Sequence, residues 1–165
     1  MTSPATAAYC RQMRLALLAL LAVVAAGCSS GPSSEPKAGP PPGKMDQRSG
    51  PPRAWLETSD GNRWLASGSS CWSSTNHVVC GDAGAPTCDQ PFIPHFRVAR
   101  GERVRAHLGF TPAGVSLSGE TGAAKPAQLH GRIVEWKVSR SGVFMVFANG
   151  DRGDASYSGC ADLTS

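Results

Sequence analysis

Histidine and serine offer this chain its most versatile chemistry, but neither type occurs in a recognised catalytic spacing. The four histidines are scattered and form neither HxH nor HExxH, so we expect no metal site: His77, His95, His107 and His130. Serines are abundant, but the nearest approach to a GxSxG motif, Gly114-Val-Ser-Leu-Ser118, lacks the closing glycine. The sequence therefore predicts no metal, no cofactor and no local catalytic nucleophile.

The segment Asn149-Gly-Asp-Arg-Gly-Asp154 has three interpretations. Its oxygens are calcium ligands by type, but the spacing departs from D-x-[DN]-x-[DN]-G and Arg152 adds an opposing charge. Its last three residues also match the tripeptide that integrins bind, although three residues match by chance often. We favour a glycine-rich turn between two core strands, in which Asp154 bonds local backbone.

Tryptophan is the remaining candidate for ligand binding, because indole rings stack on sugars. Trp136 falls on the inward face of a predicted strand and Trp72 adjoins a cysteine, so we expect both in the core. Trp55 and Trp64 remain as a possible ligand platform.

The elements that must position these side chains have the periodicity of strands. In Arg103–Phe110 the residues Val104, Ala106, Leu108 and Phe110 share one face. In 132–138 we expect Val134, Trp136 and Val138 inward, with Glu135 and Lys137 outward.

Three further patterns complete the strand prediction. Val143–Ala148 is apolar on both faces, as in a central, doubly covered strand, and Ser141-Gly142 before it is a hairpin signal. Asp60-Gly61-Asn62 marks a turn between Trp55-Leu56 and Trp64-Leu65. No stretch of ten or more residues after Ala26 has helical spacing. The sequence predicts an all-β fold, a single β-sandwich.

The N-terminus has the pattern of an export signal. Arg11 and Arg14 precede twelve residues of Leu, Ala and Val, Leu15–Ala26. A spanning helix needs about 20 apolar residues, so this run has the length of a signal-peptide core. Val24-Ala-Ala-Gly-Cys28 then resembles the lipobox of bacterial lipoproteins.

That resemblance implies that residues 1–27 are cleaved and that Cys28 is lipidated and becomes the N-terminus. Two or three acyl chains suffice for a stable anchor. The implied location is the cell membrane or the outer membrane, with the domain facing the periplasm or the exterior. The alternative is an ordinary secretory signal in which Cys28 stands by chance.

A tether and one domain follow. Sixteen of the 24 residues in 29–52 are Pro, Gly or Ser. The segment therefore has too few strongly apolar side chains to offset the loss of conformational entropy on ordering. We therefore expect the lipidated Cys28 and a tether over 28–52, and the β-sandwich domain over 53–165.

Cysteine arithmetic predicts two disulfides in that domain. Cys10 is removed with the signal peptide and Cys28 is lipidated, which leaves four cysteines: Cys71, Cys80, Cys88 and Cys160. This even number suggests two disulfides, for which three pairings are possible. We favour Cys71–Cys80, across a hairpin that turns near 74–76, and Cys88–Cys160. No CxxC is present, and the spacings fit no zinc pattern.

Two local patterns resemble known domains. Gly68-Ser-Ser-Cys-Trp72 with Cys80-Gly-Asp82 resembles the Cys-Trp…Cys-x-Asp pattern of small bacterial secreted β-domains, which implies no activity. Asp154-Ala-Ser-Tyr-Ser-Gly-Cys160 resembles the Asp-x-x-x-Tyr-x-Cys signature of immunoglobulin domains. However, Tyr157 precedes the cysteine by three residues instead of two. We therefore expect an immunoglobulin-like architecture but not a true immunoglobulin domain.

The function expected from these features is binding at the cell envelope, without catalysis. The ligand would be an envelope protein or polymer, and a loop-mediated inhibitor belongs to the same class. After residue 27 the chain has 14 basic and 12 acidic side chains. This excess of positive charge is too small to indicate nucleic-acid binding. The alternatives are a small hydrolase-like envelope enzyme, with a site assembled across strands, and a purely structural component.

Overall fold

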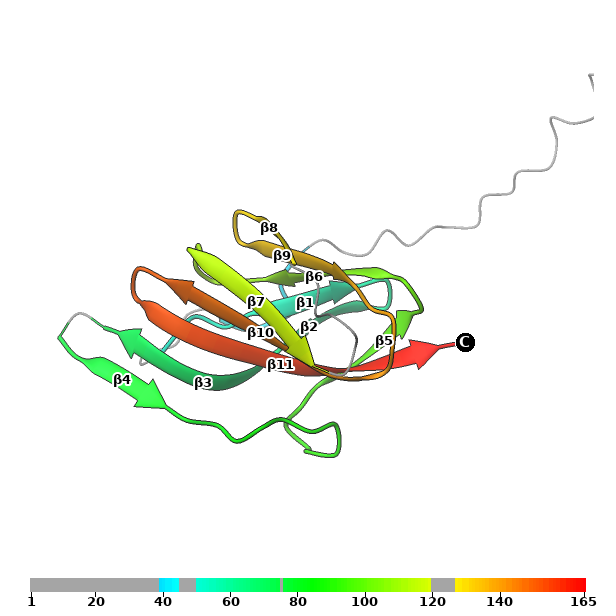
Figure 1. The fold of residues 1–165 in the computed structure, drawn as a ribbon, viewed down its shortest axis with the longest axis horizontal. Helices are drawn as coiled ribbons and strands as arrows, with labels where there is room; N and C mark the ends of the chain where they lie inside the picture. Colours follow the sequence, from blue (N-terminus) through cyan, green and yellow to red (C-terminus); the bar gives the residue numbers. More distant parts are fainter. Residues whose placement is uncertain (1–38, 45–49, 75, 120–126) are drawn as a thin grey trace, which may run out of the picture. The chain divides into compact units, whose positions relative to one another are not determined.

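The described part of the chain is all-β and forms a two-sheet sandwich. The computed structural model describes residues 39–44, 50–74, 76–119 and 127–165 (Figure 1). Within these ranges there is no helix, and so none long and apolar enough to cross a membrane. The predicted β-sandwich is confirmed. The signal peptide, the lipidation site Cys28 and most of the predicted tether lie outside the described residues.

One layer is a five-stranded antiparallel sheet with the order β2-β1-β6-β9-β8. Its strands are β1 (Trp55–Thr58), β2 (Gly61–Trp64), β6 (Arg103–His107), β8 (Gln128–His130) and β9 (Ile133–Lys137). The β1–β2 hairpin confirms the turn predicted near residue 60. Gly61 has φ +124° and pairs with Thr58, so the tight loop itself is Ser59-Asp60.

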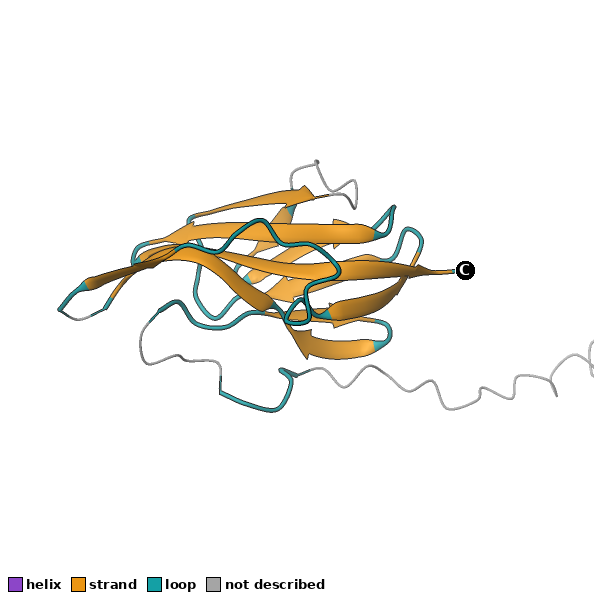
Figure 2. Cartoon of the chain, turned by 90° about the horizontal axis from the view of Figure 1, so that it is seen from below, coloured by secondary structure: helices purple, strands orange, loops and turns teal. Residues whose placement is uncertain are grey.

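The other layer is a six-stranded sheet with the order β4-β3-β11-β10-β7, and β5 joins it beside β11. Its strands are β3 (Ala66–Ser73), β4 (Val78–Gly81), β5 (His95–Ala99), β7 (Gly114–Gly119), β10 (Gly142–Gly150) and β11 (Gly153–Thr164). The first half of β11 pairs antiparallel with β3, and its last residues pair parallel with β5. In Figure 2 the loops join the strand ends of both layers.

The core lies between the two sheets and follows the predicted alternation. The inward side chains of the first predicted strand are at most 2% exposed: Val104, Ala106 and Leu108. Those of the second are at most 7% exposed: Val134, Trp136 and Val138. Both predicted inward faces are therefore confirmed. Each of these side chains is removed from water because strand residues alternate between faces. Trp72, also expected in the core, is 3% exposed and packs edge-on against Phe110.

Tyr157 lies at the centre of this core. It is fully buried, and its hydroxyl donates a hydrogen bond of 2.6 Å to the carbonyl oxygen of Pro52. Desolvation by burial raises the pKa of Tyr157. The bond joins the chain just before β1 to the middle of β11.

The hairpin predicted at Ser141-Gly142 is wrong. β9 belongs to the five-stranded sheet and β10 to the six-stranded sheet, so residues 138–141 cross between layers. β10 instead forms a hairpin with β11 through the tight turn Asp151-Arg152, and it pairs with β7 on its other side. A glycine turn signal is local, and it carries no information about which sheet the next strand joins.

The double covering predicted for Val143–Ala148 is also wrong. β10 is central in its sheet, and Phe144, Val146 and Ala148 face the core. Its other face is only partly covered: Val143 and Met145 are half-buried, and Phe147 is 40% exposed. The six-stranded sheet therefore presents apolar side chains on its outer face.

Both predicted disulfides are confirmed. Cys71–Cys80 joins directly opposed residues of β3 and β4, with 4.0 Å between Cα atoms. Cys88–Cys160 joins the β4–β5 connection to β11, with 5.5 Å between Cα atoms.

Residues 39–44, which fall within the predicted tether, contact the five-stranded sheet. The side-chain amide of Asn62 donates to the carbonyl oxygen of Gly39 at 2.6 Å, and the indole Nε1 of Trp64 donates to that of Pro42 at 3.0 Å. Pro41 is buried between these contacts.

Candidate functional site

The outer face of the six-stranded sheet carries an open groove of about 810 Å³. The groove crosses five strands at one level along their length. Its lining comprises Ser69–Cys71 of β3, Cys80–Gly81 of β4 with the following Asp82, Gly114–Ser116 of β7, Phe147–Asn149 of β10, and Asp154–Ser156 of β11. The volume falls within the range of about 300–1,000 Å³ typical of ligand pockets.

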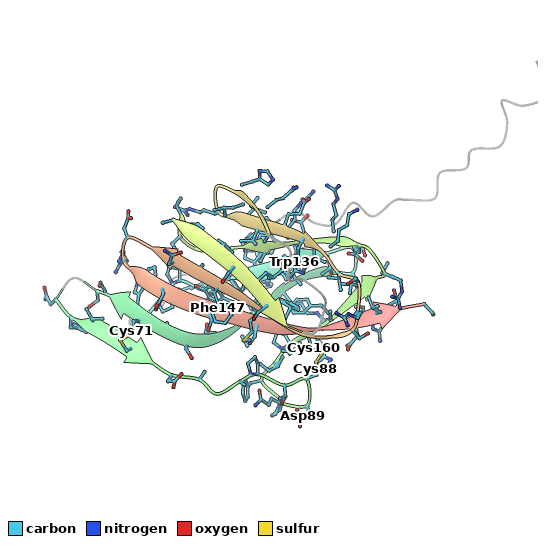
Figure 3. All side chains as sticks on the ribbon, viewed as in Figure 1. Cys71, Cys88, Asp89, Trp136, Phe147 and Cys160 are labelled. Carbon is cyan, nitrogen blue, oxygen red and sulfur yellow. A yellow bond between two sulfur atoms is a disulfide. The ribbon has the colours of Figure 1, made fainter. Side chains whose placement is uncertain are left out.

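Small side chains form the floor of the groove around one large ring. Phe147 pairs with Ser156 of β11 on one side and with Ser116 of β7 on the other. The hydroxyl of Ser156 donates to the carbonyl oxygen of Ser69 at 3.0 Å. Phe147, labelled in Figure 3, is 40% exposed between these small neighbours.

Gly68 of β3 lies against Ser156 beside this floor. A Cβ atom at Gly68 would clash with the Ser156 side chain. The sequence thus keeps the two strands close and the floor low at the same place.

Two carboxylates lie toward the β3–β4 side of the groove. Asp154 accepts a 2.7 Å hydrogen bond from the backbone N–H of Cys71 through Oδ1. Asp82 accepts a 2.8 Å hydrogen bond from the hydroxyl of Ser69 through Oδ1. Neither carboxylate forms an ion pair with a side chain in the described ranges. No Lys, Arg or His stands among the described lining residues, so the local charge is negative.

The Cys71–Cys80 disulfide forms part of the groove wall. It holds β4 against β3, and Asp82 follows β4 directly. The bridge therefore helps to fix the position of the Asp82 carboxylate relative to the sheet.

The β4–β5 connection borders the groove and adds apolar surface. A smaller hollow of about 170 Å³ lies between Ala83–Pro86, Phe92 and the outward side chains Met145 and Phe147. Phe92 is 68% exposed. Phe147 lines both hollows, so the apolar surface continues from one to the other.

A histidine clamp holds the far end of this connection. His95 Nδ1 lies 2.9 Å from Asp162 Oδ2, and His95 Nε2 lies 2.9 Å from the carbonyl oxygen of Cys88. The hydrogen bond to Asp162, and then that to the Cys88 carbonyl, raises the pKa of His95. His95, Cys160 and Asp162 also have the proximity of metal ligands, but the Cys160 sulfur is bonded to Cys88.

The predicted platform at Trp55 and Trp64 lies on the opposite sheet, and the structure leaves it little free surface. Trp55 is 5% exposed and stacks on His107, with ring centroids 3.7 Å apart. Arg53 covers the Trp64 ring at 4.2 Å, and the indole N–H is bonded to Pro42. The rings are thus already engaged by the protein itself.

Charged side chains around His107 pair with one another. His107 Nε2 lies 2.8 Å from Glu57 Oε2, and Arg105 contacts both Glu57 and Glu135. The bond from Arg105 lowers the pKa of Glu135, and the same contact raises the pKa of Arg105. This network lies across β1, β6 and β9, and neither histidine–carboxylate pair of the described chain lines the groove.

The Asn149–Asp154 segment forms the predicted turn, but Asp154 does not bond local backbone. Its partner is Cys71, 83 residues earlier. Arg152 donates to the carbonyl oxygen of Ser73 at 3.0 Å and lies over the Trp72 ring. The turn is therefore fastened to the end of β3 by both side chains.

Sequence reasoning missed Phe147 and Asp82 as site residues. Residues 143–148 are apolar on both faces, and this pattern contained the signal for Phe147. It can mean that both faces of the strand are covered. The other explanation is an exposed apolar surface. Comparison with protein-family models, with curated proteins and with solved structures gave no match.

Proposed function

We propose that this protein is an exported lipoprotein of the bacterial envelope whose β-sandwich binds a ligand in the groove of its six-stranded sheet. The observation that carries the proposal is the exposed Phe147 ring within a groove that also holds two carboxylates, neither of which has an ion-pair partner among the described residues.

The apolar lining is a feature that the fold does not require. The outer face of an antiparallel sheet commonly carries polar side chains, because it faces water. Here Met145 and Phe147 occupy outward positions of β10 beside Phe92. A contiguous apolar surface with a polar rim is the usual mark of an interaction site.

Export and anchoring are supported by separate features. Two disulfides are typical of proteins that fold in an oxidising compartment. The lipobox-like segment at Val24–Cys28 supplies the anchor. Residues 39–44 contact β2 of the five-stranded sheet, whereas the groove lies on the six-stranded sheet.

The test is capture of envelope partners by the full chain and by matched variants. Phe147→Ser removes the exposed ring, and Ser116→Trp fills the groove from β7. Leu129→Ser is the control, because Leu129 is 37% exposed but lies on β8 of the other sheet. We expect a partner that the wild type and the control retain and that both groove variants lose.

Two outcomes would contradict the proposal. A partner retained equally by all four proteins would place binding elsewhere on the surface. If the wild-type protein captured no partner from envelope extracts of its own host, the proposed binding function would be wrong.

A further inference from the structure

We infer that the occupant of the groove is an extended basic peptide segment, with an apolar side chain against Phe147 and Lys or Arg side chains against Asp154 and Asp82. This inference rests on the proposed binding function and names the ligand class for the same site.

The length of the groove fits an extended chain. It crosses the five strands β4, β3, β11, β10 and β7. Neighbouring strands lie about 4.8 Å apart, so the groove spans about 19 Å. An extended peptide advances about 3.3 Å per residue, and about six residues would therefore fill it.

The charge of the groove selects a cation. The whole chain has a formal charge of +4, yet the described lining contains two carboxylates and no basic side chain. Oδ1 of each carboxylate accepts one hydrogen bond from the protein, from Cys71 and from Ser69 respectively. The second oxygen of each has no partner within the described ranges. A lysine or arginine would form a charge-assisted hydrogen bond with it, stronger than a neutral one.

The order of these groups sets the spacing in the ligand. Phe147 lies on β10, and Asp154 lies on the neighbouring β11, two residues along the ladder from the partner of Phe147 and so about 8 Å away. The backbone of Asp82 follows β4, three strand spacings from β10. Three spacings are about 14 Å, close to the distance of about 13 Å between residues i and i+4 of an extended peptide, and the separation of Phe147 and Asp154 is close to the distance of about 7 Å between i and i+2. Side chains at i, i+2 and i+4 face the same side. The expected pattern is apolar at i, with basic residues at i+2 and i+4.

The experiment uses the fluorescently labelled hexapeptide Phe-Ser-Lys-Ser-Lys-Ser and the purified full chain. A second peptide carries Glu in place of both Lys, and a hexamer of N-acetylglucosamine tests a neutral polymer. Binding is measured by fluorescence anisotropy, with the saccharide as a competitor. We expect binding of the basic peptide, weaker binding at high salt because ions screen exposed charges, and no binding of the acidic peptide.

Isosteric variants then locate the cation contacts. Asp154→Asn and Asp82→Asn remove the charge but retain a side-chain oxygen, now that of an amide, which can accept the internal hydrogen bond. Asp60→Asn is the matched control, since Asp60 is exposed in the β1–β2 turn of the other sheet. We expect each groove variant to weaken binding about tenfold and the control to leave it unchanged. Intact disulfides in each variant, shown by peptide mapping, confirm that it has folded.

Three results would overturn the inference. They are equal binding of the acidic and basic peptides, unchanged binding in both groove variants, and displacement by the saccharide with no effect of either Asn substitution. None of them touches the proposed function, which depends on loss of partner capture in Phe147→Ser and Ser116→Trp.

Discussion

His95 has a hydrogen-bond acceptor at each of its ring nitrogens, the Asp162 carboxylate and the Cys88 carbonyl. A neutral imidazole carries one N–H and can donate only one of these bonds. The imidazolium ion donates both, which is why the pKa of His95 is raised. The protonated ring thus fastens the β4–β5 connection, the border of the groove, to β5 and β11.

This contact predicts a pH-dependent stability. Because the folded pKa of His95 is raised, its contribution is fully present below the unfolded value of about 6.5 and is lost as the pH rises through the folded pKa. Both side chains are about half exposed, so solvent screening keeps the effect small. We expect the wild-type Tm to fall by about 2–4 °C more than that of His95→Gln between pH 5.5 and pH 8.5. Parallel pH curves for the two proteins in thermal unfolding would refute the clamp.

At the scale of elements, β11 is the strand on which the six-stranded sheet depends. It pairs with β10 from Gly153 to Ala161, with β3 in its first half and with β5 over its last residues. Cys88–Cys160 attaches the β4–β5 connection to the same strand. The two disulfides differ in the length of the loop that each closes, because Cys88 and Cys160 are 72 positions apart in the sequence and Cys71 and Cys80 are nine positions apart.

That difference predicts an order of stability losses. In the chain-entropy model the long loop is worth about 4.4 kcal/mol and the short loop about 2.7 kcal/mol. Replacing Cys88 and Cys160 together by Ala should therefore lower the free energy of unfolding more than replacing Cys71 and Cys80. Urea denaturation of the two double variants measures both losses. A larger loss from the short loop would show that local strain or packing outweighs chain entropy.

Several strands and the two local hairpins β1–β2 and β3–β4 could be predicted from the sequence, but the pairing of strands far apart in the chain could not. Alternation in 103–110 and 132–138 reports a buried face directly, because side chains of a strand alternate between faces. Ser141-Gly142 reports only a local turn, and the choice between hairpin and crossover depends on partners far along the chain. The groove shows the same limit: Ser69 and Ser156, 87 residues apart, meet in its floor. Phe147 becomes recognisable as a site residue only once its neighbours are known to be serines.

At the scale of the whole molecule, the proposed function combines a lipid anchor with a surface available for binding. Residues 39–44 contact the five-stranded sheet, and the groove lies on the outer face of the six-stranded sheet. The described part of the approaching chain and the groove thus lie on different sheets.

The anchor has a direct test in its own cysteine. Cys28→Ala removes the thiol that lipidation requires, so we expect the protein to move from the membrane fraction to the soluble fraction. Two or three acyl chains hold a protein on a bilayer, and their loss leaves only weak contacts. Cys10→Ala is the matched control, because Cys10 lies within the predicted signal peptide. Membrane fractionation that is identical in both variants would exclude lipid anchoring at Cys28.

Binding in the groove is tested most directly by photo-crosslinking in the living cell. A photoreactive phenylalanine analogue replaces Phe147 in one variant and Leu129 in another, two residues of similar exposure on opposite sheets. If the groove is the binding surface, irradiation yields a defined adduct from position 147 and none from position 129. An adduct from position 129 alone would contradict that assignment.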